Sequence, residues 1–223
     1  MCQWHEWNFS MYPIDFHTHR IWNSNYIQVF NLVVKNETIP QYTKHFTAGI
    51  HPWYLTELDE RKKEIEKIAL DPACIAIGEC GIDKICVNDL KLQQAVFEYQ
   101  CELAVKLNKP IVIHAVKSHF DCAEILKRSG IKKAVFHGFN SRYTILEKIL
   151  QEGYMVSFGE HIMQKKSPAA SLIKSVPTDR FFLETDNSEK GIYNIYNAAC
   201  DLLSLKFEEL VNIQHKNFNT FIA

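Results

Sequence analysis

Residues 15–20 read DFHTHR and place two histidines two positions apart after a short apolar run. Residues i and i+2 of a strand project to one face, so the rings of His17 and His19 can converge on one point. Two convergent imidazoles suggest a metal ion, although histidine is also common without any ligand role. These six residues alone leave both interpretations open.

Further ligand-type side chains stand at the ends of other apolar segments. Singly, each has an ordinary explanation, such as a hydrogen-bonded core histidine or an aspartate that caps a helix. Clustered in an apolar interior, they would carry a large desolvation cost unless a cation or paired partners compensated it. The whole set therefore favours a metal centre. Its members are His17, His19, His51, Glu79, His114, His137 and Asp186.

The elements that must position these residues are short β-branched or aromatic runs that alternate with longer helical patterns, which is typical of βα units. There are eight such runs, the strand number of a (β/α)8 TIM barrel, and in that fold the site lies at the carboxyl ends of the strands. Each ligand-type residue stands at such an end. The predicted strands are 12–17, 26–34, 46–52, 74–81, 110–116, 133–139, 154–160 and 180–186.

Helical periodicity follows the later strands and predicts an outer layer of helices. Between the block DFHTH and the second strand only the six residues RIWNSN remain, too few for a covering helix. We therefore expect a trimmed α/β barrel whose first helix is vestigial or missing. The predicted helices are 55–70, 88–108, 118–129, 141–152, 168–175, 192–204 and 206–220.

Composition narrows the class of protein. With 223 residues, 47% of them hydrophobic, the chain can bury one large core, so we expect a single domain over 1–223. The net charge of −1 gives no global attraction to polyanions, so any contact with nucleic acid would be local. Residues 1–11 form an aromatic leader with Trp4, Trp7 and Phe9, for which packing on the open flank, disorder and a dimer contact are equally good explanations.

The seven cysteines include no C-x-x-C pair, and we find neither a secretory signal nor an apolar run of the roughly 18 residues that a membrane helix needs. We expect reduced thiols in a cytoplasmic chain, no membrane contact and no obligate protein partner.

The ordered blocks DFHTH, GIHPWYL, AIGECGID, IVIHAV, HGF and LETD resemble the signature of the TatD family of metal-dependent hydrolases, amidohydrolase-like TIM barrels that include TatD-related deoxyribonucleases. The resemblance covers residues 12 to 186, and the C-terminal segment is similar to the closing helices of the family. It implies two divalent metal ions bridged by Glu79. The first would be held by His17, His19 and Asp186, and the second by His114 and His137.

A pair of metal ions can activate a water for in-line attack on a phosphodiester. Asp186 is then the best candidate for the general base, because it is both a ligand and adjacent to the water. Glu79, as the bridge, and His51 complete the predicted catalytic set, with His51 directed at the substrate; its alternative is a structural histidine before Pro52. Ligand types leave the metal open among magnesium, manganese and zinc.

Two departures from the family pattern bear on the substrate. The family usually has an arginine after the strand-five histidine, whereas this chain offers Lys117, a weaker phosphate ligand. The chain also looks shortened between His19 and His51 and after Asp186. Trp53 could stack on a nucleotide base, with core packing as its alternative.

These features leave three functions. The first is a deoxyribonuclease that acts on a DNA end, the second a hydrolase of a small ester, amide or phosphoester, and the third a non-catalytic metal-binding protein.

Supporting residues are also predicted near the ligands. Asp83 either fixes the loop after the fourth strand or orients a ligand. Glu184 lies two residues before Asp186 and therefore deeper on the same face. Cys80 follows Glu79 and should face the opposite side as a packing thiol.

Overall fold

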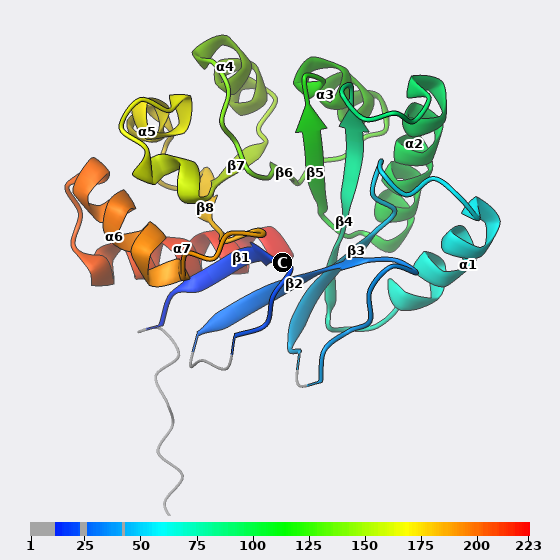
Figure 1. The fold of residues 1–223 in the computed structure, drawn as a ribbon, viewed down its shortest axis with the longest axis horizontal. Coiled ribbons are helices and arrows are strands. Elements are labelled where there is room, and N and C mark those ends of the chain that lie inside the picture. Colours follow the sequence, from blue (N-terminus) through cyan, green and yellow to red (C-terminus); the bar gives the residue numbers. More distant parts are fainter. Residues whose placement is uncertain (1–11, 23–25, 42) are drawn as a thin grey trace, which may run out of the picture.

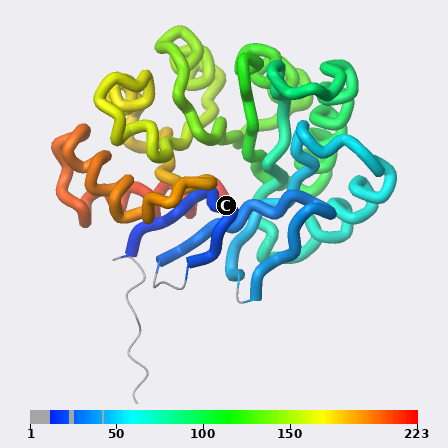
Figure 2. Tube along the Cα trace, viewed as in Figure 1, coloured from blue at the N-terminus to red at the C-terminus, as the bar shows by residue number. Residues whose placement is uncertain are grey.

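The computed structural model describes residues 12–22, 26–41 and 43–223, and the aromatic leader at 1–11 lies outside this part. Eight parallel strands pair in chain order, β1 with β2 and onward to β8, as predicted. Figure 2 shows the chain running around the barrel from blue to red, so that its last helices return beside its first strand. The strands are β1 (Ile14–Thr18), β2 (Ile27–Val33), β3 (His45–Gly49), β4 (Cys74–Asp83), β5 (Ile111–Val116), β6 (Ala134–Phe136), β7 (Met155–Phe158) and β8 (Phe181–Leu183).

Helices follow the third and later strands and form the outer layer (Figure 1). Local sequence sets several of their ends. The Asp89 carboxylate accepts the N–H of Leu92 at the start of α2, and Ser167 caps α5 with Pro168 in its first turn. The helices are α1 (Leu58–Ile68), α2 (Leu90–Leu107), α3 (His119–Arg128), α4 (Tyr143–Gln151), α5 (Pro168–Leu172), α6 (Ile192–Leu203) and α7 (Phe207–Ile222), with short 3₁₀ turns η2 (Glu160–Met163) and η3 (Ile173–Ser175).

The early crossovers are the shortened part of the fold. In the connection from β1 to β2, the described residues 19–22 and 26 contain no helix, as predicted. The described residues 34–41 and 43–44, between β2 and β3, form none either. Neither β1 nor β2 is followed by a helix in the described residues, and the first helix of the outer layer, α1, packs against β3 (Figure 1). No helix in the described ranges is long and apolar enough to cross a bilayer.

The floor of the barrel is apolar and closed by the C-terminal helix. Phe16 and Phe182 stack with ring centroids 3.9 Å apart, and Phe221 of α7 meets both rings edge-on. Aromatic residues from α7 thus plug the end of the barrel opposite the site. The cluster comprises Ile14, Phe16, Val29, Ala76, Val112, Val135, Met155, Phe182, Phe218 and Phe221.

Above this floor, the next inward position of most strands is polar. Side chains two residues apart share one face of a strand. Val112 is followed by His114, Val135 by His137 and Phe182 by Glu184 in this way, and other strands add Asn31, Thr47 and Ser157.

Strands β1 and β4 break this alternation. The pairing register shifts between Asp15 and Thr18 and again between Ile77 and Cys80. The shifts bring His17 and Glu79 inward after Phe16 and Ala76, although neither residue stands two positions beyond the apolar one. Bulges that re-aim a side chain are common beside functional sites. Cys80 is left facing the buried layer under the helices, as predicted.

Candidate metal centre

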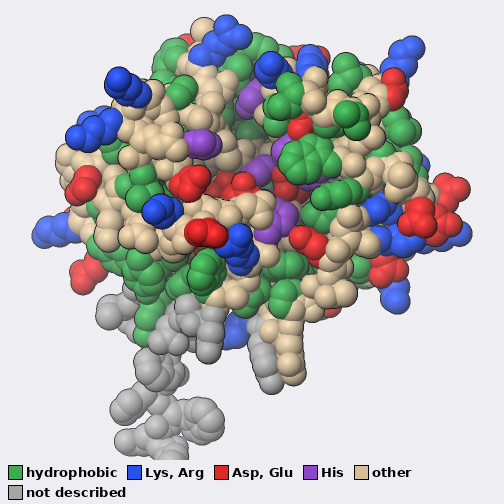
Figure 3. Space-filling model, in the orientation of Figure 1, with side chains coloured by type: hydrophobic (Ala, Val, Ile, Leu, Met, Phe, Trp, Pro, Cys, Tyr) green, Lys and Arg blue, Asp and Glu red, His purple; other side chains and the backbone are tan. Residues whose placement is uncertain are grey.

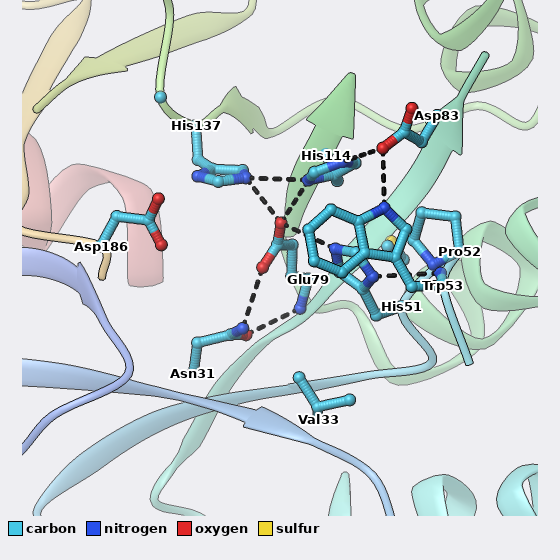
Figure 4. A network of polar contacts seen from close by, with 12 residues as sticks. Asn31, Val33, His51, Pro52, Trp53, Glu79, Asp83, His114, His137 and Asp186 are labelled. Carbon is cyan, nitrogen blue, oxygen red and sulfur yellow. Dashed lines mark hydrogen bonds and ion pairs between the residues drawn. The ribbon is translucent and has the colours of Figure 1, made fainter. Parts of the chain in front are cut away.

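Glu79 lies at the centre of the polar layer (Figure 4), with an exposed fraction of only 3%. Its Oε1 lies 2.5 Å from Nδ1 of His114, 2.6 Å from Nε2 of His137 and 3.3 Å from Nε2 of His51. Its Oε2 lies 3.5 Å from Nε2 of His17 and 3.6 Å from Nε2 of His19. All five predicted histidines therefore converge on one carboxylate.

An outer carboxylate stands behind each of three histidines. Glu37 lies 3.3 Å from Nδ1 of His19, Asp83 lies 3.3 Å from Nε2 of His114, and Glu184 lies 3.4 Å from Nδ1 of His137. The contacts at His19 and His114 are hydrogen bonds, whereas Nδ1 of His137 has no hydrogen bond in the described residues and only an ion-pair contact with Glu184. A carboxylate in this position can take the ring N–H and direct the other ring nitrogen at a metal. The arrangement agrees with the predicted ligand roles of His19, His114 and His137.

The ring of His51 is arranged differently. Its Nδ1 accepts the backbone N–H of Trp53 at 3.1 Å, so a neutral ring carries its proton on Nε2, which faces Glu79. A protonated nitrogen cannot bind a metal ion. The neutral ring is therefore not a metal ligand in this geometry, and the contact of His51 with the substrate stays a prediction.

His17 and Asp186 complete the centre on the β1 side. Within the described part of the chain, neither ring nitrogen of the buried His17 has a hydrogen-bond partner. Asp186, whose side chain is 40% exposed, brings Oδ1 to 3.9 Å from Nε2 of His17 and 3.6 Å from Nε2 of His19. An unpartnered buried imidazole beside a carboxylate is costly unless a ligand occupies the space between them.

Asn31 of β2 and Glu37 were missed by the sequence analysis. Asn31 Oδ1 accepts the backbone N–H of Glu79 at 2.9 Å, which fixes the amide so that Nδ2 faces Glu79 Oε2 at 3.0 Å and His19 Nε2 at 3.3 Å. The one signal for Asn31 is a polar residue inside the apolar run YIQVFNLVV. Glu37 lies in a turn and has no such signal.

The electrostatics of the centre follow from its crowding. Burial opposes the charge on Glu79, but His137 and the other histidines hold the pKa of Glu79 well below its usual range. Burial likewise opposes the charge on His19, yet Glu37 and Glu79 raise its pKa to about 10. Burial dominates at His51 and lowers its pKa. Ring protons and a bound cation would compensate the same carboxylates, so metal binding should displace protons here.

Figure 3 shows histidine and acidic side chains gathered in a central hollow. This hollow has two lobes that meet at the centre, and both include His114, His137, Asp186 and Asn187. The first, here the Trp53 lobe, has a volume of about 310 Å³ and is lined further by His19, Val33, Asn36, Glu37, His51, Trp53, Tyr54 and Glu79. The second, here the Glu160 lobe, has a volume of about 330 Å³ and is lined further by Ala115, Val116, Gly138, Gly159, Glu160, His161, Glu184, Thr185 and Ser188.

The predicted substrate contacts fall in different places. His51 and Trp53 line the first lobe, and the Trp53 ring is half exposed rather than packed in the core. Lys117 is exposed after β5 and lines neither lobe.

The donor sets fit divalent metal ions. Three groups each offer ligand atoms within 4.8 Å of one another, and imidazole with carboxylate suits zinc, manganese or iron. The main observation in favour of a metal ion here is that both ring nitrogens of the buried His17 have no hydrogen-bond partner in the described residues. The groups are His17, His19 and Asp186; His17, Glu79 and His137; and His51, Glu79 and His114, and in the third group only Glu79 and His114 remain as ligands while the neutral His51 ring carries its proton on Nε2.

The model of the TatD-related DNase family matches residues 26–223. The chain belongs to this family. An uncharacterized metal-dependent hydrolase of Buchnera aphidicola subsp. Acyrthosiphon pisum is 29% identical over 175 residues, which cover 74% of this chain and 64% of the relative. A protein of Erwinia tasmaniensis named 3′-5′ ssDNA/RNA exonuclease TatD is 33% identical over 146 residues, which cover 63% of this chain and 56% of the relative.

The matched part of the chain thus spans between about half and two thirds of the length of these relatives. Among solved structures, the TatD homologue YjjV from Escherichia coli K12 superposes with a TM-score of 0.82 at 19% sequence identity. The superposition covers 96% of this chain and 98% of the YjjV chain. This likeness shows that the chain has the TatD barrel fold.

Proposed function

We propose that this TatD-family protein is a metal-dependent hydrolase of phosphodiester bonds that acts on DNA ends. The observation that carries the proposal is the convergence of His19, His114 and His137 on Glu79, each with a carboxylate behind its outer nitrogen. A purely structural polar cluster does not need a carboxylate on each side of three histidine rings. The Erwinia relative, named a 3′-5′ ssDNA/RNA exonuclease, supports a nucleic-acid substrate.

Two divalent ions are proposed at the centre. His17, His19 and Asp186 would hold the first, His114 and His137 the second, and Glu79 both. When bound, such ions supply an activated water and neutralise charge on a phosphoryl oxygen.

The residues of the chain supply the remaining chemistry. Asp186, the most exposed carboxylate of the centre, is placed to take the proton of the attacking water at its Oδ atoms. His51, neutral and protonated on Nε2, is a donor for an oxygen of the substrate. The half-exposed ring of Trp53 offers a stacking surface for a base, and Lys117 is a candidate for contact with a more distant phosphate.

The two lobes support a diester as substrate. A phosphorus at the shared wall of His114, His137 and Asp186 would have room on both sides for its two ester groups. A monoester would need only one lobe.

The test is hydrolysis by metal-stripped protein that is re-supplied separately with magnesium, manganese and zinc. The substrates are single-stranded DNA oligonucleotides labelled at the 5′ end or at the 3′ end, so that trimming from either end is seen, and bis-p-nitrophenyl phosphate; Asp186→Asn is the control variant. Stepwise shortening of the oligonucleotide that Asp186→Asn lacks is the expected result.

Other outcomes select the alternatives. Cleavage of the small diester with DNA left intact would favour a hydrolase of small phosphoesters. Metal binding without turnover of either substrate would favour a non-catalytic metal-binding protein.

A further inference from the structure

Trp53 is anchored at both ends to the proposed metal centre. Its indole Nε1 donates to Oδ2 of Asp83 at 2.7 Å, and its backbone N–H donates to Nδ1 of His51 at 3.1 Å. The ring also meets His51 and His114 edge-on, with centroids 4.8 and 5.9 Å away. A tryptophan side chain that is 53% exposed would ordinarily sample several rotamers. The contacts with Asp83, His51 and His114 hold this one in a single position.

Asp83 is itself fixed from several directions. The carboxylate is buried, and its Oδ1 accepts the backbone N–H groups of Ile85 at 2.9 Å and Cys86 at 3.2 Å. Gln93 accepts the backbone N–H of Asp83 at 2.8 Å and donates to its carbonyl at 3.1 Å. These bonds hold the backbone and Oδ1 of Asp83, so the position of Oδ2 depends on its side-chain partners Trp53 and His114.

The single oxygen Oδ2 of Asp83 accepts from both Trp53 and His114, the latter at 3.3 Å (Figure 4). The opposite nitrogen of His114 faces Glu79 at 2.5 Å. A continuous path of hydrogen bonds therefore joins the exposed ring at the mouth of the Trp53 lobe to the central carboxylate.

We propose that Trp53 has two separable roles: its face binds a nucleobase beside the metal centre, and its indole N–H works with Asp83 to hold His114 in the orientation that binds metal. Asp83 is the positioning residue for His114. The inference rests on the proposed function and deepens it, because it makes the substrate of the Trp53 lobe a phosphoester that carries a planar base. Base stacking on an ordered aromatic ring is tolerant of sequence, as an end-trimming enzyme requires.

Two substitutions separate the roles. Trp53→Phe keeps an aromatic face but removes the N–H, whereas Trp53→Leu removes both. Tyr143→Leu on α4 is the matched control, because Tyr143 is 52% exposed and lines neither lobe.

The first measurement is calorimetric binding of deoxyadenosine 5′-monophosphate and of 2-deoxyribose 5-phosphate, which lacks the base, to the Mn²⁺-loaded protein. We expect the wild type, Trp53→Phe and Tyr143→Leu to prefer the nucleotide, and Trp53→Leu to bind it about 5- to 100-fold more weakly. Equal binding of the two probes by the wild type would overturn the stacking role.

The second measurement is the affinity of each protein for Mn²⁺ alone. We expect a loss of about 2- to 10-fold in Trp53→Phe and of about 10- to 100-fold in Asp83→Asn, whose amide would turn a donor toward His114 or Trp53. Thermal melting shows whether the Asp83→Asn protein is folded. If it is not, the Mn²⁺ affinity of Trp53→Phe alone tests the positioning role. Wild-type Mn²⁺ affinity in Trp53→Phe would overturn the positioning role.

The inference and the proposed function fail in different ways. Base-selective binding without hydrolysis of DNA contradicts the proposed function alone. Hydrolysis of DNA by Trp53→Leu at the wild-type rate and KM contradicts the inference alone.

Discussion

The backbone of Asp186 is hydrogen-bonded on both sides to the end of β1: its N–H donates to the carbonyl of His17 at 2.8 Å, and its carbonyl accepts the N–H of His19 at 3.2 Å. The bridge between Thr18 and Asp186 that these bonds form joins the last strand to the first. The closure of the barrel therefore also sets the carboxylate of Asp186 beside the two histidines. Asp186 has a φ of +52°, in the left-handed region that asparagine and aspartate tolerate.

Replacing Asp186 by asparagine should remove activity without unfolding the protein. The amide tolerates the same φ and leaves both backbone bonds in place, but it cannot accept a proton from water. We expect the rate of DNA hydrolysis to fall by about 10²- to 10⁴-fold and the free energy of unfolding to change by less than about 0.5 kcal/mol. Oligonucleotide assays and urea titrations check the two parts. A variant that keeps more than about a tenth of the wild-type rate contradicts the role of Asp186 as the general base.

Replacing Glu184 by glutamine should weaken metal binding, although Glu184 is not a proposed ligand. Its Oε1 accepts the N–H of Gly138 at 2.7 Å and faces His137, and its Oε2 accepts the hydroxyl of Ser157. An amide has only one acceptor oxygen and would turn an N–H₂ group toward a donor. We expect Mn²⁺ affinity, measured by calorimetry, to fall by about 10- to 100-fold.

The matched control for Glu184→Gln is Glu160→Gln. Glu160 lines the same lobe and accepts the hydroxyl of Ser188, but within the described residues it forms no hydrogen bond with a proposed ligand. Equal losses of Mn²⁺ affinity in the two variants would mean that general charge in the lobe, and not the orientation of His137, sets the affinity.

The sequence predicted the strands and the set of convergent residues because both depend on local patterns. An apolar run that ends in a histidine or carboxylate can be found without knowing its neighbours. The local sequence could not predict how the strands bring the side chains of His17 and Glu79 to the inside of the barrel. The register shifts that do so depend on pairing with other strands. Glu37 was missed for a similar reason, because only the folded turn after β2 carries it to His19.

Replacing Gly49 by alanine should destabilise the protein through the contact between β3 and β4. A Cβ at this position would lie 2.4 Å from the carbonyl oxygen of Glu79 and 2.7 Å from its nitrogen, so the strand that carries the central carboxylate would have to move. We expect a loss of about 1–3 kcal/mol in the free energy of unfolding and weaker Mn²⁺ binding. Gly191→Ala is the control, because φ there is −64° and the nearest atom to a Cβ is 4.0 Å away. Comparable losses in the two variants would contradict this account.

His119 at the start of α3 should make stability depend on pH. Its ring packs between Phe136 and Phe139, with centroids 6.1 and 5.9 Å away, and burial with the nearby His114 lowers its pKa to about 4. The unfolded chain takes up a proton below about pH 6.5, whereas the folded protein does not do so until about pH 4. Protonation therefore favours the unfolded state, and the free energy of unfolding should fall as the pH drops through this interval.

The variant His119→Phe tests this dependence, because a phenyl ring fits the same aromatic packing and does not titrate. Between pH 7 and pH 5 the wild type should lose about 1–2 kcal/mol more of its unfolding free energy than the variant does. Urea titrations at the two pH values measure the difference, and an NMR titration of the His119 ring, which should stay neutral down to about pH 4, provides an independent check. Parallel pH dependence in the two proteins would mean that His119 takes up its proton at the same pH in the folded and the unfolded chain, and it would contradict the lowered pKa.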